Sequence, residues 1–162
     1  MPDNGAMANR HCGSCTACCE GWVKSESIGM YPGNPCKHCT ESGCAIYETR
    51  PRNPCRTFVC GWLRTDSPLP DHMRPDNAGV IVVMGDKWRK WKVLKAVATG
   101  PSIPAASLEA VKKLAFQSKT PLLITEFVES GGKIVGEIVR GFGPPEFSAA
   151  VQQKVQQRQE AS

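Results

Sequence analysis

Cysteine spacing constrains this chain of 162 residues more than any other feature. All nine cysteines lie between Cys12 and Cys60, and the rest of the chain contains none. The first four form a Cys-x-x-Cys-x-x-Cys-Cys run from Cys12 to Cys19. A region with so many thiols and so little apolar sequence needs either disulfides or bound metal to hold its backbone in place.

The beginning of the chain favours metal over disulfides. The segment from Met1 to Gly5 is polar and lacks the apolar stretch of a secretory signal. We therefore expect a cytoplasmic protein, and reducing conditions there disfavour disulfides. Cysteines two residues apart can also supply two ligands to one ion from a single tight turn.

Eight thiols are expected to be metal ligands: Cys12, Cys15, Cys18, Cys19, Cys36, Cys44, Cys55 and Cys60. Structural zinc takes four tetrahedral ligands, so eight thiolates suit two such sites or one binuclear site with bridging thiolates. Neighbouring side chains on an extended backbone point in opposite directions. Cys18 and Cys19 are therefore expected to serve different ions or to bridge a pair. Zinc is the expected cofactor, and iron or an iron–sulfur cluster, which also takes four thiolates, is the alternative.

Two residues between the ligands are candidates for an additional role. Cys39 is the ninth cysteine, and we expect it to be a free thiol beside a filled site; a bridging ligand is the alternative. His38 lies between Cys36 and Cys39, and it or His11 could replace a thiolate in a site of three cysteines and one histidine. His72 is expected to face solvent.

The cysteine pattern resembles a known family. The residues that carry the resemblance are the Cys12–Cys19 run, Pro35-Cys36, Gly43-Cys44-Ala45-Ile46-Tyr47 followed by Arg50-Pro51, and Cys55-Arg56-Thr57-Phe58-Val59-Cys60. They look like the bacterial CxxCxxCC family of zinc- or iron-chelating proteins, the YkgJ-like cysteine cluster proteins, over roughly the first half of the chain. The resemblance implies a metal site built from the eight thiols and leaves the metal open. A related cluster occurs in flagellin lysine N-methylases, which adds an enzymatic alternative.

The predicted function is a cytoplasmic metal-binding protein, with a role in metal homeostasis or as a structural or interaction module. The alternative is an iron–sulfur protein or a redox or methyl-transfer-associated enzyme. The sequence contains no Walker loop, Gly-x-Gly-x-x-Gly motif or evident Ser-His-Asp set, so we assign no catalytic residue and leave enzymatic activity open. Around the last ligands, Arg50, Arg52, Arg56 and Arg64 are expected to donate to thiolates and loop carbonyls.

The expected partners are metal ions. Eight thiolates would subtract eight charges and two divalent ions would add four, which reduces the formal charge of +5 to about +1. We therefore expect no nucleic-acid partner, although Trp88-Arg89-Lys90-Trp91-Lys92 interleaves aromatic and basic residues as single-strand binders do. No segment approaches the roughly 20 consecutive apolar residues of a bilayer span, so we expect no membrane partner. A protein partner is not identified.

The chain divides into five predicted segments. Residues 1–10 are a disordered leader, 11–65 the cysteine-rich region, 66–78 a connector, 79–143 a small α+β domain, and 144–162 a polar C-terminal helix or tail. Three prolines disfavour regular structure in the connector.

The second half is expected to fold as an α+β domain of order β-β-α-β-β. Strands are predicted at residues 79–84 and 92–97, a helix at 105–117, and a hairpin from strands 122–128 and 134–139 around Gly131-Gly132. A helix over residues 88–98 is the alternative for the second strand. We therefore predict a loop-rich, metal-stabilised cysteine-rich region packed on a small antiparallel sheet with one main helix.

Overall fold

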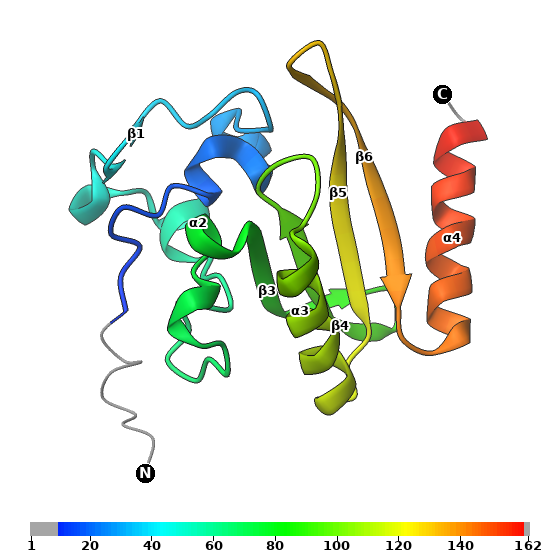
Figure 1. Ribbon diagram of the computed structural model, residues 1–162. Coiled ribbons are helices and arrows are strands. Elements are labelled where there is room, and N and C mark those ends of the chain that lie inside the picture. Colours follow the sequence, from blue (N-terminus) through cyan, green and yellow to red (C-terminus); the bar gives the residue numbers. More distant parts are fainter. Residues whose placement is uncertain (1–9, 161–162) are drawn as a thin grey trace.

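The computed structural model of the chain describes residues 10–160, so residues 1–9 of the predicted leader and 161–162 of the predicted tail lie outside the described range. A loop-rich region lies on one side of the molecule, and a twisted sheet with two longer helices forms the other (Figure 1). This is the α+β architecture that the sequence predicts, with the strand and helix order β-β-α-β-β confirmed.

The larger sheet has four strands in the order β3-β4-β5-β6. They are β3 (Val80–Trp88), β4 (Trp91–Ala98), β5 (Leu122–Ser130) and β6 (Lys133–Phe142). The pairs β3–β4 and β5–β6 are antiparallel hairpins, as expected. The pair β4–β5 is parallel, so the expectation of a wholly antiparallel sheet is wrong. The reason is the crossover through helix α3 (Ala105–Gln117), because parallel neighbours need such a long connection.

The second strand settles an alternative left open by the sequence. Residues 92–97 belong to β4, so the helical interpretation of this segment is wrong. Val93 and Leu94 are adjacent and both buried, because one side chain points to each face of the sheet and both faces are covered.

A C-terminal helix, α4 (Pro145–Glu160), packs beside β6 (Figure 1). Its Phe147 is completely buried, and the rings of Trp88 and Trp91 meet it edge-on at 5.7 and 5.3 Å between centroids. Edge-to-face packing of this kind is favourable beyond the area it buries. The two tryptophans of the interleaved aromatic and basic segment thus anchor a helix. A polar helix or tail was predicted for residues 144–162, and the structure has a helix there; what the sequence did not predict is its packing on the sheet, which a few buried side chains provide.

The cysteine-rich region consists of short turns. They are η1 (Cys18–Trp22), η2 (Glu26–Ile28), the two-residue strands β1 (Cys39–Thr40) and β2 (Gly43–Cys44), η3 (Tyr47–Thr49) and η4 (Arg52–Arg56). After it, η5 (Asp71–Met73) and α2 (Pro75–Ala78) occupy the connector, where the sequence predicted no regular structure. The difference has a local cause, since a proline at the first position of a helix is favourable.

One apolar core joins the two regions. Trp62 of the cysteine-rich side is buried in the same cluster as Val82 of β3 and Val111 of α3. The Trp22 ring lies 5.2 Å from that of Phe127 on β5, and the Gly61 N–H donates to the Val82 carbonyl oxygen on the outer strand β3. The cysteine-rich region is therefore docked on the sheet through contacts with both β3 and β5. Within residues 10–160, no helix is both long and apolar enough to cross a bilayer.

Candidate metal centre

A cavity of about 700 Å³ lies within the cysteine-rich region. Eight thiols line it: Cys12, Cys15, Cys18, Cys19, Cys36, Cys44, Cys55 and Cys60. These are the eight residues predicted as ligands, and the turns bring them together from distant positions in the sequence. All nine cysteines, Cys39 included, are free thiols. For description we divide the eight into an inner and an outer group, and charges also act between the two groups.

The inner group consists of Cys12, Cys15, Cys18 and Cys60. Cys15 N–H donates to the Cys12 carbonyl oxygen at 2.8 Å, which closes the first turn. Burial raises the pKa of Cys18 well above its usual value, and the nearby thiols of Cys60, Cys12, Cys15 and Cys19 raise it further. Burial likewise raises the pKa of Cys60, to which Cys12 and Cys15 contribute. Cys60 belongs to the apolar core, and Cys15 and Cys18 pack against it.

The outer group consists of Cys19, Cys36, Cys44 and Cys55. The Cys36 N–H donates to the Cys19 carbonyl oxygen at 2.7 Å, although many residues separate them in the sequence. Burial raises the pKa of Cys19 to about 12, with contributions from Cys39, Cys44, Cys36 and Cys12. Burial is also the main cause of the raised pKa of Cys55, and the charges of Cys36 and Cys44 add to it. None of these four thiols packs against the apolar core formed by the described residues.

The two groups lie next to each other. Gly43 has φ of +132° and approaches Gly13 so closely that a Cβ at this position would lie 2.5 Å from the Gly13 carbonyl oxygen. Only glycine fits such a contact, because the backbone conformation and the space both exclude a side chain. The contact brings the turn before Cys44 against the turn that holds Cys12. The adjacent residues Cys18 and Cys19 fall into different groups.

Cys39 is the one cysteine that does not line the described cavity. It lies directly opposite Cys44 on the two-residue ladder of β1 and β2. Its thiol lies 4.0 Å from the Thr40 carbonyl oxygen. Burial raises the pKa of Cys39, as do the charges of Glu20, Cys36 and Cys44. The thiol is therefore close to the outer group but outside its cavity.

The three histidines differ in whether they line the cavity. His38 is half-buried and lines the cavity, and its backbone N–H approaches the Cys36 sulfur at 3.5 Å. His11 and His72 are exposed, and neither is among the residues that line the described cavity. His38 is thus the histidine that lines the described cavity.

Arg50 and Tyr47 form a polar wall of the same cavity. The Arg50 guanidinium lies 3.9 Å from the centroid of the Tyr47 ring and donates to the Tyr47 carbonyl oxygen at 2.7 Å. Its charge favours the thiolates of Cys12 and Cys55, where it opposes the larger effect of burial on their pKa. The expected donation to loop carbonyls is therefore seen for Arg50, and also for Arg56, which donates to the Glu48 carbonyl oxygen at 2.7 Å. Arg64 instead pairs with Asp66 on the surface.

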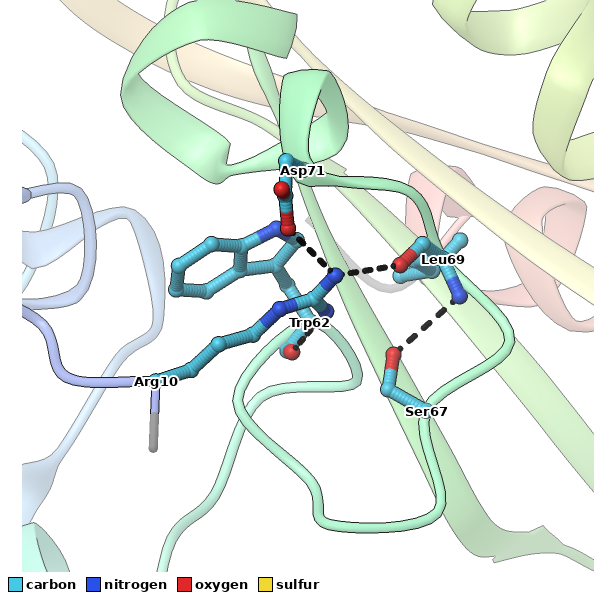
Figure 2. Close-up of polar contacts among 5 residues, drawn as sticks. All are labelled: Arg10, Trp62, Ser67, Leu69 and Asp71. Atoms are coloured by element: carbon cyan, nitrogen blue, oxygen red, sulfur yellow. Dashed lines mark hydrogen bonds and ion pairs between the residues drawn. The ribbon is translucent and has the colours of Figure 1, made fainter. Parts of the chain in front are cut away.

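Arg10 is a residue that the sequence analysis missed, because it lies at the end of the predicted leader. Its side chain is only 6% exposed and lies flat against Trp62, 4.6 Å from the ring centroid. The guanidinium donates to the carbonyl oxygens of Trp62 and Leu69 at 2.7 and 2.9 Å and to Asp71 at 2.8 Å (Figure 2). Arg10 therefore connects the segment just before Cys12, the first candidate ligand, to the segment just after Cys60, the last one.

The donor chemistry of the cavity suits a thiophilic metal, but the thiols are not drawn together. Within residues 10–160, no three Cys, His, Asp or Glu side chains lie close enough to form a ready metal-binding group. Two sets of four sulfurs around one cavity still match the ligand number and type of zinc or iron–sulfur sites. Comparison with known proteins gives no identity, since no family model, curated protein or solved structure matches this chain.

Proposed function

We propose that this protein binds metal through its cysteine cluster, holding two zinc ions in two four-thiolate sites. The observation that carries the proposal is the cavity, because turns from Cys12 to Cys60 bring eight thiols to one place. Ordinary buried cysteines would be scattered through the core as small apolar side chains. We also propose the relationship to the CxxCxxCC family, on the spacing of the same thiols.

The electrostatics of the cavity support the proposal. Burial raises the pKa of Cys18 and Cys60, and the neighbouring thiols of Cys12 and Cys15 raise the pKa of both further. Without a cation, thiolates here are therefore unfavourable. A divalent ion would reverse the sign of that effect, because it stabilises every thiolate around it. Closing the thiols around the ions would make metal binding part of the folding of this region.

The role that we propose is in metal homeostasis or as a structural module of the cytoplasm. An iron–sulfur protein or an enzyme related to the flagellin lysine N-methylase cluster is the second candidate, since the same four-sulfur groups suit a cluster. The visible absorbance of the purified protein separates the zinc protein from the iron–sulfur candidate, because zinc is colourless and iron–sulfur clusters absorb visible light.

The test is anaerobic purification of the full chain followed by elemental analysis, acid-labile sulfide measurement and thiol titration. About two zinc ions per chain with most thiols protected is the expected result. Iron with stoichiometric sulfide would replace zinc with the second candidate. A folded chain that binds neither metal after reconstitution, and in which every thiol titrates freely, would overturn the proposal.

A further inference from the structure

The hairpin of β1 and β2 places two cysteines directly opposite each other. We propose that Cys39 and Cys44 are a reversible redox pair, which a low-molecular-weight disulfide such as glutathione disulfide oxidises to an intramolecular disulfide. The inference is drawn from the strand pairing, needs no bound metal and goes beyond the proposed function. Because Cys44 lines the cysteine cavity, oxidation of the pair would remove one thiol from the cavity, and reduction would return it.

The hydrogen bonds around the hairpin identify the kind of pair that the two cysteines form. The Ala45 N–H donates to the His38 carbonyl oxygen at 2.9 Å, so the pair next to Cys39 and Cys44 is hydrogen-bonded. Hydrogen-bonded and non-hydrogen-bonded pairs alternate along an antiparallel ladder. Cys39 and Cys44 are therefore a non-hydrogen-bonded pair. In agreement, the Cys39 N–H donates away from the ladder, to the Cys36 carbonyl oxygen at 2.9 Å.

The separation within such a pair allows a disulfide. The Cα atoms of a non-hydrogen-bonded pair lie about 4.5 Å apart, and the two side chains lie close together on one face. Disulfides join cysteines whose Cα atoms are roughly 4.4–6.8 Å apart, so the bond can form without a large movement of the backbone. This separation is at the short end of that range. A strained bond is easily reduced, which suits a transient, redox-sensing disulfide and not a permanent crosslink.

Cys39 is the cysteine expected to react first. Both thiols are free and partly exposed, but Cys39 lies outside the described cavity that Cys44 lines. The Cys39 sulfur attacks one sulfur of glutathione disulfide, whose S–S bond breaks, and one glutathione leaves as a thiol with the proton that Cys39 gives up. The Cys44 sulfur then attacks the Cys39 sulfur and displaces the second glutathione, which takes the Cys44 proton. Two electrons pass from the pair to the oxidant.

Cys36 is the competing partner for Cys39, because the two cysteines lie two residues apart in one turn. The Cys36 sulfur, however, already accepts the His38 backbone N–H at 3.5 Å within that turn. Opposed residues on a ladder project to the same face, which gives Cys44 the more direct approach to Cys39. The experiment is therefore designed to distinguish these two bonds.

The full chain, as purified, is oxidised with glutathione disulfide, and samples are alkylated at intervals, digested with trypsin and analysed by mass spectrometry. Residues 38–52 form one tryptic peptide, because Arg50 precedes a proline, and its cysteines are Cys39 and Cys44 alone. The proposed bond makes this peptide lighter by two hydrogens and blocks its alkylation. A bond from Cys36 to Cys39 would instead join it to residues 25–37. We expect the looped 38–52 peptide to be the first disulfide to accumulate, and dithiothreitol to reverse it.

Single substitutions test the order of the two steps. Cys44→Ser should stop the reaction at the mixed disulfide of Cys39 with glutathione. Cys39→Ser should leave Cys44 open to alkylation under the same conditions. Cys36→Ser is the matched control, since it removes the competing thiol and should still give the looped peptide.

Three results would overturn the inference: a first disulfide between residues 25–37 and 38–52, a Cys39 thiol that stays open to alkylation while other thiols oxidise, or no mixed disulfide in Cys44→Ser. None of these bears on the proposed function, which the metal and sulfide content of the untreated sample tests. A chain that carries no metal but forms the looped peptide would overturn the proposed function and support the redox pair.

Discussion

The sheet region and the cysteine-rich region are stabilised by different means. In the sheet region, side chains such as Val80, Ile81, Val111 and Phe147 are completely buried. Between Arg10 and Cys60, the buried apolar side chains are those of Ala17, Met30 and Cys60. Packing alone can account for the first region, because burial of large apolar groups is the main favourable term in folding. The second region needs another source of order, and the eight thiols around its cavity supply the candidate.

The largest expected effect is that of metal removal. Chelation should unfold residues 12–60 and leave β4, β5, β6 and α4 protected, because metal-binding energy at such sites is folding energy. Hydrogen exchange followed by mass spectrometry measures this segment by segment. Equal loss of protection in both regions would show that the core shared through Trp62 makes them one cooperative unit, and no loss in either would show that the loops hold without metal.

The next largest effect is expected from a substitution that destabilises only the sheet region. Phe147→Ala should lower the free energy of unfolding by about 3–5 kcal/mol, since it removes a fully buried ring between Trp88 and Trp91. Denaturant titration of the metal-loaded protein measures the change, and metal content should stay the same. Phe116→Ala is the matched control, because Phe116 is 80% exposed and its loss should change little. A change in metal content with Phe147→Ala would mean that the two regions are coupled through the sheet.

The sequence predicted most of the sheet region because its signals are local. The helix was expected at residues 105–117 and lies there, since Val111 and Ala115 recur at helical spacing on a buried face. The parallel β4–β5 pair depends on where the crossover returns, which strand patterns do not encode. The order strand-helix-strand was the available signal, because such a connection typically joins parallel strands. The docking of α4 was missed for a different reason: apart from its two anchoring side chains, Phe147 and Val151, the helix offers little apolar surface, and the residues after Val151 are mostly polar.

Arg10 provides the third test, with an effect on the cysteine-rich side. Arg10→Ala should destabilise the metal-loaded protein by about 1.5–3 kcal/mol, because a buried charged donor to the carbonyls of Trp62 and Leu69 is lost. The ion pair with Asp71 adds little, since that carboxylate is 93% exposed. Thermal melting measures the change. Arg64→Ala, which removes a surface pair with Asp66, is the control and should leave the melting temperature almost unchanged.

If Arg10→Ala and Arg64→Ala melt alike, the order of the cysteine-rich region does not depend on the Arg10 contact. Arg10→Lys adds a finer comparison. A lysine keeps the charge but lacks the planar fork that reaches two carbonyls at once, so it should recover only part of the lost stability.

The smallest expected effect concerns an ion pair between the regions. Lys24 pairs with Glu137 of β6 at 3.0 Å, and its side chain is 55% exposed. Lys24→Ala should therefore cost no more than about 0.5 kcal/mol. Trp22→Ala, which removes the ring packed on Phe127, should cost several times as much. Denaturant titration of both variants ranks the contacts, and the reverse order would mean that charge, not apolar packing, joins the regions.

The candidate site was predictable in its residue types and not in its arrangement. Cysteine spacing identified the eight thiols, because paired cysteines are a strong chemical signal. Their arrangement around the cavity depends on long-range loop contacts, such as Cys36 with Cys19 and Gly43 with Gly13, and glycine and proline turns do not reveal these from sequence. Arg10 was assigned to the leader because a single buried arginine leaves no periodic pattern.

The bond from Gly61 to Val82 also bears on the behaviour of incompletely loaded copies of the chain. It covers part of β3, an outer strand whose Val80-Ile81-Val82-Val83 run is rich in β-branched residues. An uncovered strand of this composition is a template for pairing with another chain. If metal loss undocks the loop after Cys60, light scattering should detect self-association of the apo protein before the sheet itself unfolds. A shortage of metal would then first become visible as aggregation.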